Sequence, residues 1–192
     1  MTCQLLRALI LCVSIFTSGA LRAETYLVRA GDSRSQIGFQ IRQFGIFWIS
    51  GRFQRFSGKL TLHGARAGAS RVRIEIDAAS INSDFPARDR YLRSEAVLAT
   101  RHYPKITFQS TKTKVTGPDT ALVTGDMTFR EITRRVAIRV RYVHGSDRDG
   151  RGAGKQFIGQ TSFRLSEFGV TGIPTLTSDR VFLTIRLALS PT

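Results

Sequence analysis

Histidine, cysteine and serine are the residues of this chain that could carry catalysis or bind a metal, and their spacing favours neither. The three histidines, His63, His102 and His144, stand far apart, and none lies at metal-ligand spacing from another His, a Cys or a close carboxylate. The sequence also lacks the Gly-x-Ser-x-Gly elbow of hydrolases, the phosphate-binding P-loop and the dinucleotide fingerprint. We therefore expect a protein that is not an enzyme and needs no metal or cofactor.

The first 23 residues have the composition of a secretory signal peptide. Arg7 accompanies an apolar run from Leu5 to Phe16, and small residues follow it. The run is shorter than the roughly 20 apolar residues that a membrane-spanning helix needs. We expect cleavage after Ala20 or Ala23, a periplasmic location, and one domain over residues 24–192. Both cysteines would leave with the signal peptide, and lipoprotein processing at the second is disfavoured because a leucine precedes it.

The chain is strongly basic. It holds 29 Lys and Arg against 14 Asp and Glu, and loss of residues 1–23 would leave 27 against 14, a formal charge of +13. One interpretation is an arginine-rich surface that keeps the protein soluble. The other is attraction to anionic lipid headgroups or to a diphosphate-bearing ligand. Nucleic acid is not an expected partner of an exported protein.

Alternation of apolar and polar residues with period two recurs along the chain and predicts strands with one buried face. Gly51 and Gly58 fall inside a long alternating run and predict bends or bulges there. About eight strands separated by turns favour an all-β fold, an antiparallel barrel with a short helical insertion. We predict strands over residues 36–42, 52–62, 71–77, 105–114, 121–129, 134–143, 157–165 and 180–189.

The helical insertion is predicted within residues 88–98. Asp89 and Arg93 stand four residues apart with the acid first, the order that stabilises a helical turn. Ser94 is a candidate N-cap for a second turn that begins at Glu95.

The inward face of the predicted barrel is apolar and rich in aromatic residues on strand after strand. Eight strands enclose an interior just wide enough for side chains or for one ligand, and the spacing alone favours a filled core. An outer-membrane barrel would alternate in the same way. It is disfavoured because the last strand lacks an aromatic girdle and the chain ends in Ser190, Pro191 and Thr192.

Several segments together resemble a known family. They are YLVRAGDSRSQIGFQI, GRFQRFSGKL, VRIEIDAASINS, RDRYLRSEAVLATRHYPKITFQST, GDMTFREITRRVAIRV and EFGV, in this order along the chain. This ensemble resembles the YceI-like family of periplasmic isoprenoid-binding proteins. The resemblance implies a lipocalin-like barrel that holds a long isoprenoid chain, such as a polyprenyl diphosphate or a quinone tail, lengthwise in its interior.

The resemblance also implies where a ligand would make contact. The chain would lie against inward side chains of the strands and the helix, and an arginine would meet the head group. The implied chain-binding residues are Phe39, Ile41, Phe56, Ile74, Ile76, Tyr91, Leu92, Phe108, Ile138, Val140, Tyr142, Phe163, Leu183 and Ile185, and the head-group candidates are Arg42, Arg88 and Arg93.

The expected function is therefore binding, storage or transport of a long-chain isoprenoid or similar amphiphilic lipid, with an anionic membrane surface as a further candidate partner. The alternative is a barrel with a filled core whose basic surface binds an anionic partner. Salt separates the two, because surface ion pairing weakens as ionic strength rises. Formation of a homodimer is left open.

Overall fold

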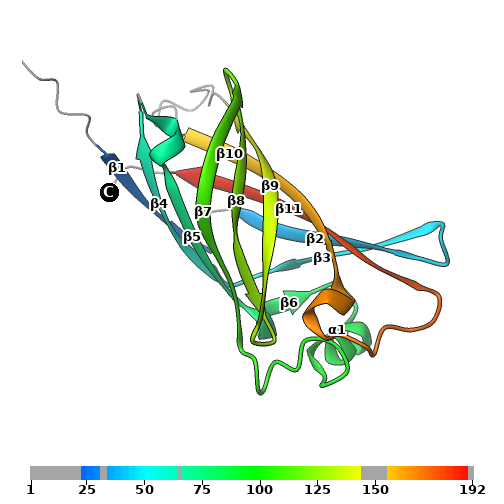
Figure 1. Cartoon of the computed structure of the whole chain (residues 1–192). Helices are drawn as coiled ribbons and strands as arrows, with labels where there is room; N and C mark the ends of the chain where they lie inside the picture. The colour runs from blue at the N-terminus through cyan, green and yellow to red at the C-terminus, as the bar shows by residue number, and fades with distance from the viewer. Residues whose placement is uncertain (1–22, 31–33, 65, 144–154, 190–192) are drawn as a thin grey trace, which may run out of the picture.

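The computed structural model describes residues 23–30, 34–64, 66–143 and 155–189 and is built mainly of strands (Figure 1). Residues 1–22 of the predicted signal peptide and the loop with His144 lie outside the described residues. The strands are β1 (Ala23–Arg29), β2 (Gln36–Gln43), β3 (Phe47–Phe53), β4 (Phe56–His63), β5 (Arg71–Asp77), β6 (Ile81–Asn82), β7 (Lys105–Gly117), β8 (Thr120–Phe129), β9 (Ile132–Val143), β10 (Lys155–Arg164) and β11 (Thr177–Leu189). The helical elements are η1 (Ala67–Ala69), η2 (Ala78–Ser80), α1 (Pro86–Arg93) and η3 (Leu165–Phe168).

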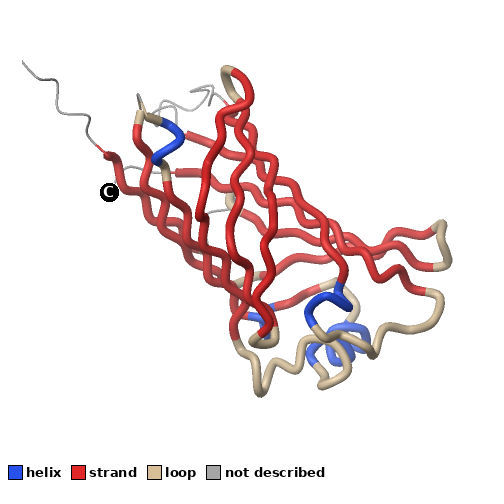
Figure 2. Tube along the Cα trace, in the orientation of Figure 1, coloured by secondary structure: helices blue, strands red, loops and turns tan. Residues whose placement is uncertain are grey.

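The strands form one antiparallel sheet in the order β1-β4-β5-β7-β8-β9-β10-β11-β2-β3-β6. The sheet curls until β1 lies beside β11, which makes a barrel (Figure 2). Helix α1, η3 and the short strand β6 gather at one end of this barrel, and the β7–β8 turn lies at the other end (Figure 1). The prediction of an antiparallel barrel with one short helix is confirmed.

The structure has eleven strands in the described part of the chain, against the eight predicted. Strands β1 and β6 were not predicted, and the predicted strand over residues 52–62 is divided at Gln54 and Arg55. Here Gln54 N–H donates to the carbonyl of Ser80 at 3.1 Å, and Arg55 N–H donates to the Ser80 hydroxyl at 3.0 Å. Because these amides bond to η2 and not to a neighbouring strand, the chain turns a corner at this point.

The predicted bends at Gly51 and Gly58 were wrong. Both glycines lie in strands whose pairing register continues past them without a shift. Their role is to leave room: a Cβ on Gly51 would lie 2.5 Å from the ring of Phe39, and one on Gly58 would lie 2.4 Å from Ile74 Cδ1.

Helix α1 begins earlier and ends earlier than predicted. Pro86 occupies its first turn, where the missing N–H costs nothing. The predicted cap at Ser94 was wrong, because Ser94 ends the helix and its hydroxyl donates to the carbonyl of Tyr91 at 2.6 Å. The expected pairing of Asp89 with Arg93 was also wrong. Asp89 is buried and accepts from the N–H and hydroxyl of Ser83 at 2.8 and 2.5 Å.

Candidate binding cavity

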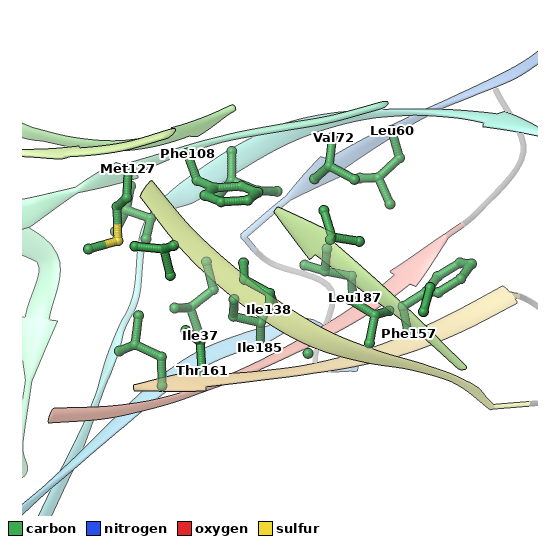
Figure 3. A pocket seen from close by; sticks show the side chains of 18 of the residues that line it. Ile37, Leu60, Val72, Phe108, Met127, Ile138, Phe157, Thr161, Ile185 and Leu187 are labelled. Carbon is green, nitrogen blue, oxygen red and sulfur yellow. The ribbon is translucent and has the colours of Figure 1, made fainter. Parts of the chain in front are cut away.

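The barrel encloses a cavity of about 600 Å³ that extends along the strands. Its wall is the inward face of the alternating strands. Ile37, Ile138 and Ile185, from β2, β9 and β11, point into it (Figure 3). A filled core, which the residue spacing alone favoured, is therefore not what the structure has. The volume lies within the range of roughly 300–1,000 Å³ that is typical of ligand pockets.

Glycines determine how two aromatic rings lie in this wall. The ring of Phe39 covers Gly51 on the adjacent strand, and the ring of Phe108 covers Gly125, where a Cβ would stand 2.6 Å from Phe108 Cζ. Each ring occupies the place of a missing side chain in the wall. Because the two rings lie over glycines, they occupy less of the cavity volume than they would if these two positions had side chains.

The end of the cavity near α1 is closed by apolar side chains. Leu92, Val97 and Leu98 line it there, from α1 and the turn that follows. Behind them Phe168 is fully buried, with its ring centroid 5.2 Å from that of Phe163 and 5.7 Å from that of Phe129. This end offers a ligand apolar contacts.

The opposite end of the cavity carries charged groups. Lys155 Nζ, at the start of β10, donates to Glu24 Oε2 of β1 at 2.5 Å and to the hydroxyl of Tyr26 at 2.7 Å. The Tyr26 hydroxyl also donates to Glu24. These bonds connect β1, an edge strand of the curled sheet, with β10, the seventh strand in the sheet order.

The same bonds shift both ionisation equilibria. The hydrogen bond from Lys155 is the main cause that lowers the pKa of Glu24 below its usual value, with help from Tyr26. The hydrogen bond to Glu24 is the main cause that raises the pKa of Lys155. Both groups are therefore charged throughout the neutral range, and the ammonium is at the cavity lining.

His63 also lines this end, and its Nδ1 is buried without a hydrogen-bond partner in the described part of the chain. A buried polar nitrogen without a partner has a desolvation cost. A donor or acceptor on a bound molecule, or a water, would remove that cost. The polar groups of the cavity are thus concentrated at the end away from α1.

Most of the side chains that were predicted to contact a ligand line this cavity. The exceptions are Phe56, which is buried outside the lining, and Tyr91, which is exposed and donates its hydroxyl to the carbonyl of Gly172. The predicted residues that do line it are Phe39, Ile41, Ile74, Ile76, Leu92, Phe108, Ile138, Val140, Tyr142, Phe163, Leu183 and Ile185.

The three arginines predicted at the head group do not line the cavity. Arg42 is exposed on the outer face of β2 and lies over the ring of Trp48 at 4.8 Å. Arg88 donates to the hydroxyl and carbonyl of Ser83 at 2.8 and 2.7 Å. Arg93 donates to the carbonyls of residues 79 and 81 at 2.8 and 2.6 Å. All three make contacts that stabilise the fold outside the lumen.

The charged lining residues Glu24, Asp119 and Lys155 were missed from the sequence, and His63 was not among the predicted ligand contacts. Alternation does offer a signal for Glu24 and Lys155, because each stands two positions before an inward residue on its strand: Tyr26 for Glu24 and Phe157 for Lys155. The pairing of Glu24 with Lys155 has no signal in the sequence, since 131 positions separate the two residues.

Within the described residues, no cluster of three His, Cys, Asp or Glu side chains is arranged to hold a metal ion. None of the described helices is both long enough and apolar enough to span a membrane.

The fold and the cavity define a class: a single antiparallel β-barrel with an apolar interior that is polar at one end. The YceI-like domain model matches residues 29–189, and the chain belongs to this family. It is 31% identical to a UPF0312 protein of Azotobacter vinelandii over 166 residues, which are 86% of each chain. It is 32% identical to UPF0312 protein PA0423 of Pseudomonas aeruginosa over 165 residues, again 86% of each chain.

Solved structures share the fold. BcnA of Burkholderia cenocepacia superposes with a TM-score of 0.73 at 21% identity, over 81% of this chain and 96% of that one. A protein from Saccharophagus degradans, described as a polyisoprenoid binding domain implicated in plant cell wall breakdown, superposes with a TM-score of 0.63 at 16% identity, over 89% of this chain and all of that one. At these identities the likeness establishes the barrel architecture.

Proposed function

We propose that this protein binds a long-chain isoprenoid lipid in its barrel and stores or carries it in the periplasm without changing it chemically. The observation that carries the proposal is a cavity of about 600 Å³ that is apolar along its length and charged at one end. The description of the Saccharophagus structural relative as a polyisoprenoid binding domain supports the same ligand class.

The favourable term in such binding is burial of the apolar chain. An isoprenoid chain that loses about 400 Å² of accessible surface gains on the order of 10 kcal/mol at roughly 25 cal/mol per Å². Association and immobilisation cost an estimated 4–15 kcal/mol. The wall needs no polar group along the chain, because the chain has none. Affinity would therefore depend on the length of apolar contact.

The head group would lie at the end with Lys155, Glu24 and His63. An ammonium is a suitable partner for a diphosphate, and Nδ1 of His63, which has no partner among the described residues, could accept or donate once a ligand approached. A neutral head group with one carbonyl or hydroxyl would use the same nitrogen. Arg88 and Arg93 of α1 donate to backbone carbonyls, and Arg42 of β2 lies over the ring of Trp48, so these arginines are not needed for this role.

Native mass spectrometry of protein purified from its own periplasm tests the proposal. We expect a stoichiometric mass increment that solvent extraction releases as a long-chain apolar lipid. Protein without an increment that also fails to take up an added polyprenyl diphosphate would refute it. Enzymatic conversion is tested in the same sample, because the lipid recovered after incubation should be chemically identical to the lipid added.

A second candidate function rests on the outer surface. Arg139 and Arg141 of β9 and Arg186 of β11 are exposed on the outer face of the two strands that flank β10. They could bind an anionic polymer or protein. Binding of that kind should weaken steeply between low and physiological salt, whereas uptake of an isoprenoid chain should change little.

A further inference from the structure

The β2–β3 hairpin projects beyond the barrel (Figures 1 and 2). Its tip is apolar and exposed. Phe44 is 53% exposed, Ile46 71%, Phe47 61% and Trp48 47%. Leu176, 61% exposed, lies beside them, since its carbonyl accepts from Phe44 N–H at 2.6 Å. We call these five residues the aromatic finger. An exposed apolar cluster of this kind marks an interaction surface.

Folding does not explain the residue at the tip. Phe44 and Gly45, the central residues of the turn, have φ values of +54° and +71°. Asn followed by Gly is the preferred pair for such a turn, and a large side chain with positive φ is disfavoured. Because the Phe44 ring is largely exposed, packing does not offset that cost. The ring is therefore better explained by contact with something outside the chain.

The finger is apolar on both of its faces. Trp48 lies on the outer face, where its ring meets that of Phe182 at 5.6 Å. Phe47 is the adjacent residue of the same strand and points to the opposite face, the face on which Ile41 lines the cavity. A flat protein partner would cover one face only. Immersion in the interfacial region of a bilayer covers both.

The charge around the finger is positive. The hairpin that carries the finger, residues 36–53, contains Arg42 and Arg52 and no Asp or Glu. Arg42 lies over Trp48, and Arg180 and Arg164 are exposed on the outer face of the next strands, directly paired with each other in register. Such a surface attracts anionic headgroups, and Trp beside a basic residue is typical of the membrane–water interface.

We propose that the aromatic finger docks this protein on the surface of an anionic bilayer, with Phe44, Ile46 and Trp48 in the interface and Arg42 at the headgroups. The proposal does not depend on the lipid in the cavity. The end of the barrel with Lys155 and Glu24 then faces away from the membrane.

Tryptophan fluorescence provides a direct test, because Trp48 is the single tryptophan of the chain. The mature protein is titrated with phosphatidylcholine vesicles that contain or lack phosphatidylglycerol. With anionic vesicles we expect a blue shift of the emission and quenching by brominated acyl chains. Vesicles without phosphatidylglycerol should bind much more weakly. Emission that does not change with anionic vesicles would overturn the proposal.

The variant Phe44→Asn separates docking from folding. It introduces the preferred Asn-Gly turn, so the thermal unfolding midpoint should be kept or raised, while vesicle affinity should fall by about tenfold. The matched control is Leu27→Asn on the outer face of β1, where Leu27 is 48% exposed. This control should bind vesicles as the wild type does.

Two results would contradict docking on a bilayer. One is wild-type vesicle affinity in Phe44→Asn. The other is a blue shift of Trp48 that depends on protein concentration without vesicles, which would assign the finger to contact with a second copy of the chain.

Discussion

A bulky side chain placed in the middle of the cavity should prevent ligand binding while the barrel remains folded. Leu183 of β11 is suited to this test, because it lines the cavity and stands in register with Phe39 of β2 and Thr161 of β10, which line it too. The variant Leu183→Trp would extend an indole into the existing space. No backbone atom needs to move for the ring to fit into a lumen of about 600 Å³.

The magnitude follows from the surface that the indole would take from the ligand. A buried Trp side chain covers about 150 Å² or more. If the isoprenoid chain loses that contact, its binding weakens by about 4 kcal/mol at roughly 25 cal/mol per Å², which is roughly a thousandfold. The unfolding free energy of the empty protein should change by less than about 1.5 kcal/mol, because the ring fills space and replaces no packed neighbour.

The matched control is Thr184→Trp. Thr184 is the next residue of the same strand and points to the outer face of the barrel, paired with Gly38 and Gln160. It should bind the lipid as the wild type does. The assay is uptake of a polyprenyl diphosphate, combined with thermal unfolding of each empty protein. Wild-type affinity in Leu183→Trp, with a normal unfolding transition, would refute an isoprenoid chain in this part of the cavity.

Three further predictions concern the fold and the polar end. Ile37→Ala removes a side chain with 0% exposure and should lower the free energy of unfolding in urea by about 2–5 kcal/mol; a loss below about 1 kcal/mol would contradict close packing there. Asp89→Asn weakens the buried acceptor of both Ser83 donors and should cost about 1–3 kcal/mol, with faster amide exchange of the Ser83 N–H; unchanged exchange would contradict that role. The pKa of Glu24 is lowered in the folded protein, so its contact with Lys155 stabilises the fold above the usual Glu range and is lost as pH falls through the lowered pKa. The pKa of Lys155 is raised in the folded protein, so the same contact is lost at high pH only as pH rises through the raised pKa. The difference in unfolding midpoint between wild type and Glu24→Gln should therefore stay constant from about pH 6 to pH 9, and a change inside that window would contradict a charged pair.

The barrel could be predicted from sequence because its signal is local. On β5, and on β9 from Arg135 to Tyr142, the side chains alternate between lumen and solvent, and a few consecutive residues reveal that period. The division between β3 and β4 could not be predicted in the same way. Ser80 causes it, and Ser80 is 25 positions from Arg55 in sequence. The bends predicted at Gly51 and Gly58 were wrong because each glycine leaves room for a side chain of the paired strand. Which residue pairs with a glycine cannot be read from the sequence.

The wall of the cavity was predictable for the same reason as the strands, and its polar end was not. An arginine that binds a diphosphate and an arginine that satisfies backbone carbonyls need the same donors, so sequence alone does not separate them. Arg88 and Arg93 bond to carbonyls of the segment that leads into α1, in and beside β6, an edge strand of the sheet. Lys155 and Glu24 come together only because the sheet curls and brings its first strand to its seventh. The residues that meet at the mouth of the barrel are therefore set by how the sheet closes, which is a long-range property. The residues of its wall are set by the alternation of side chains along each strand, which is local.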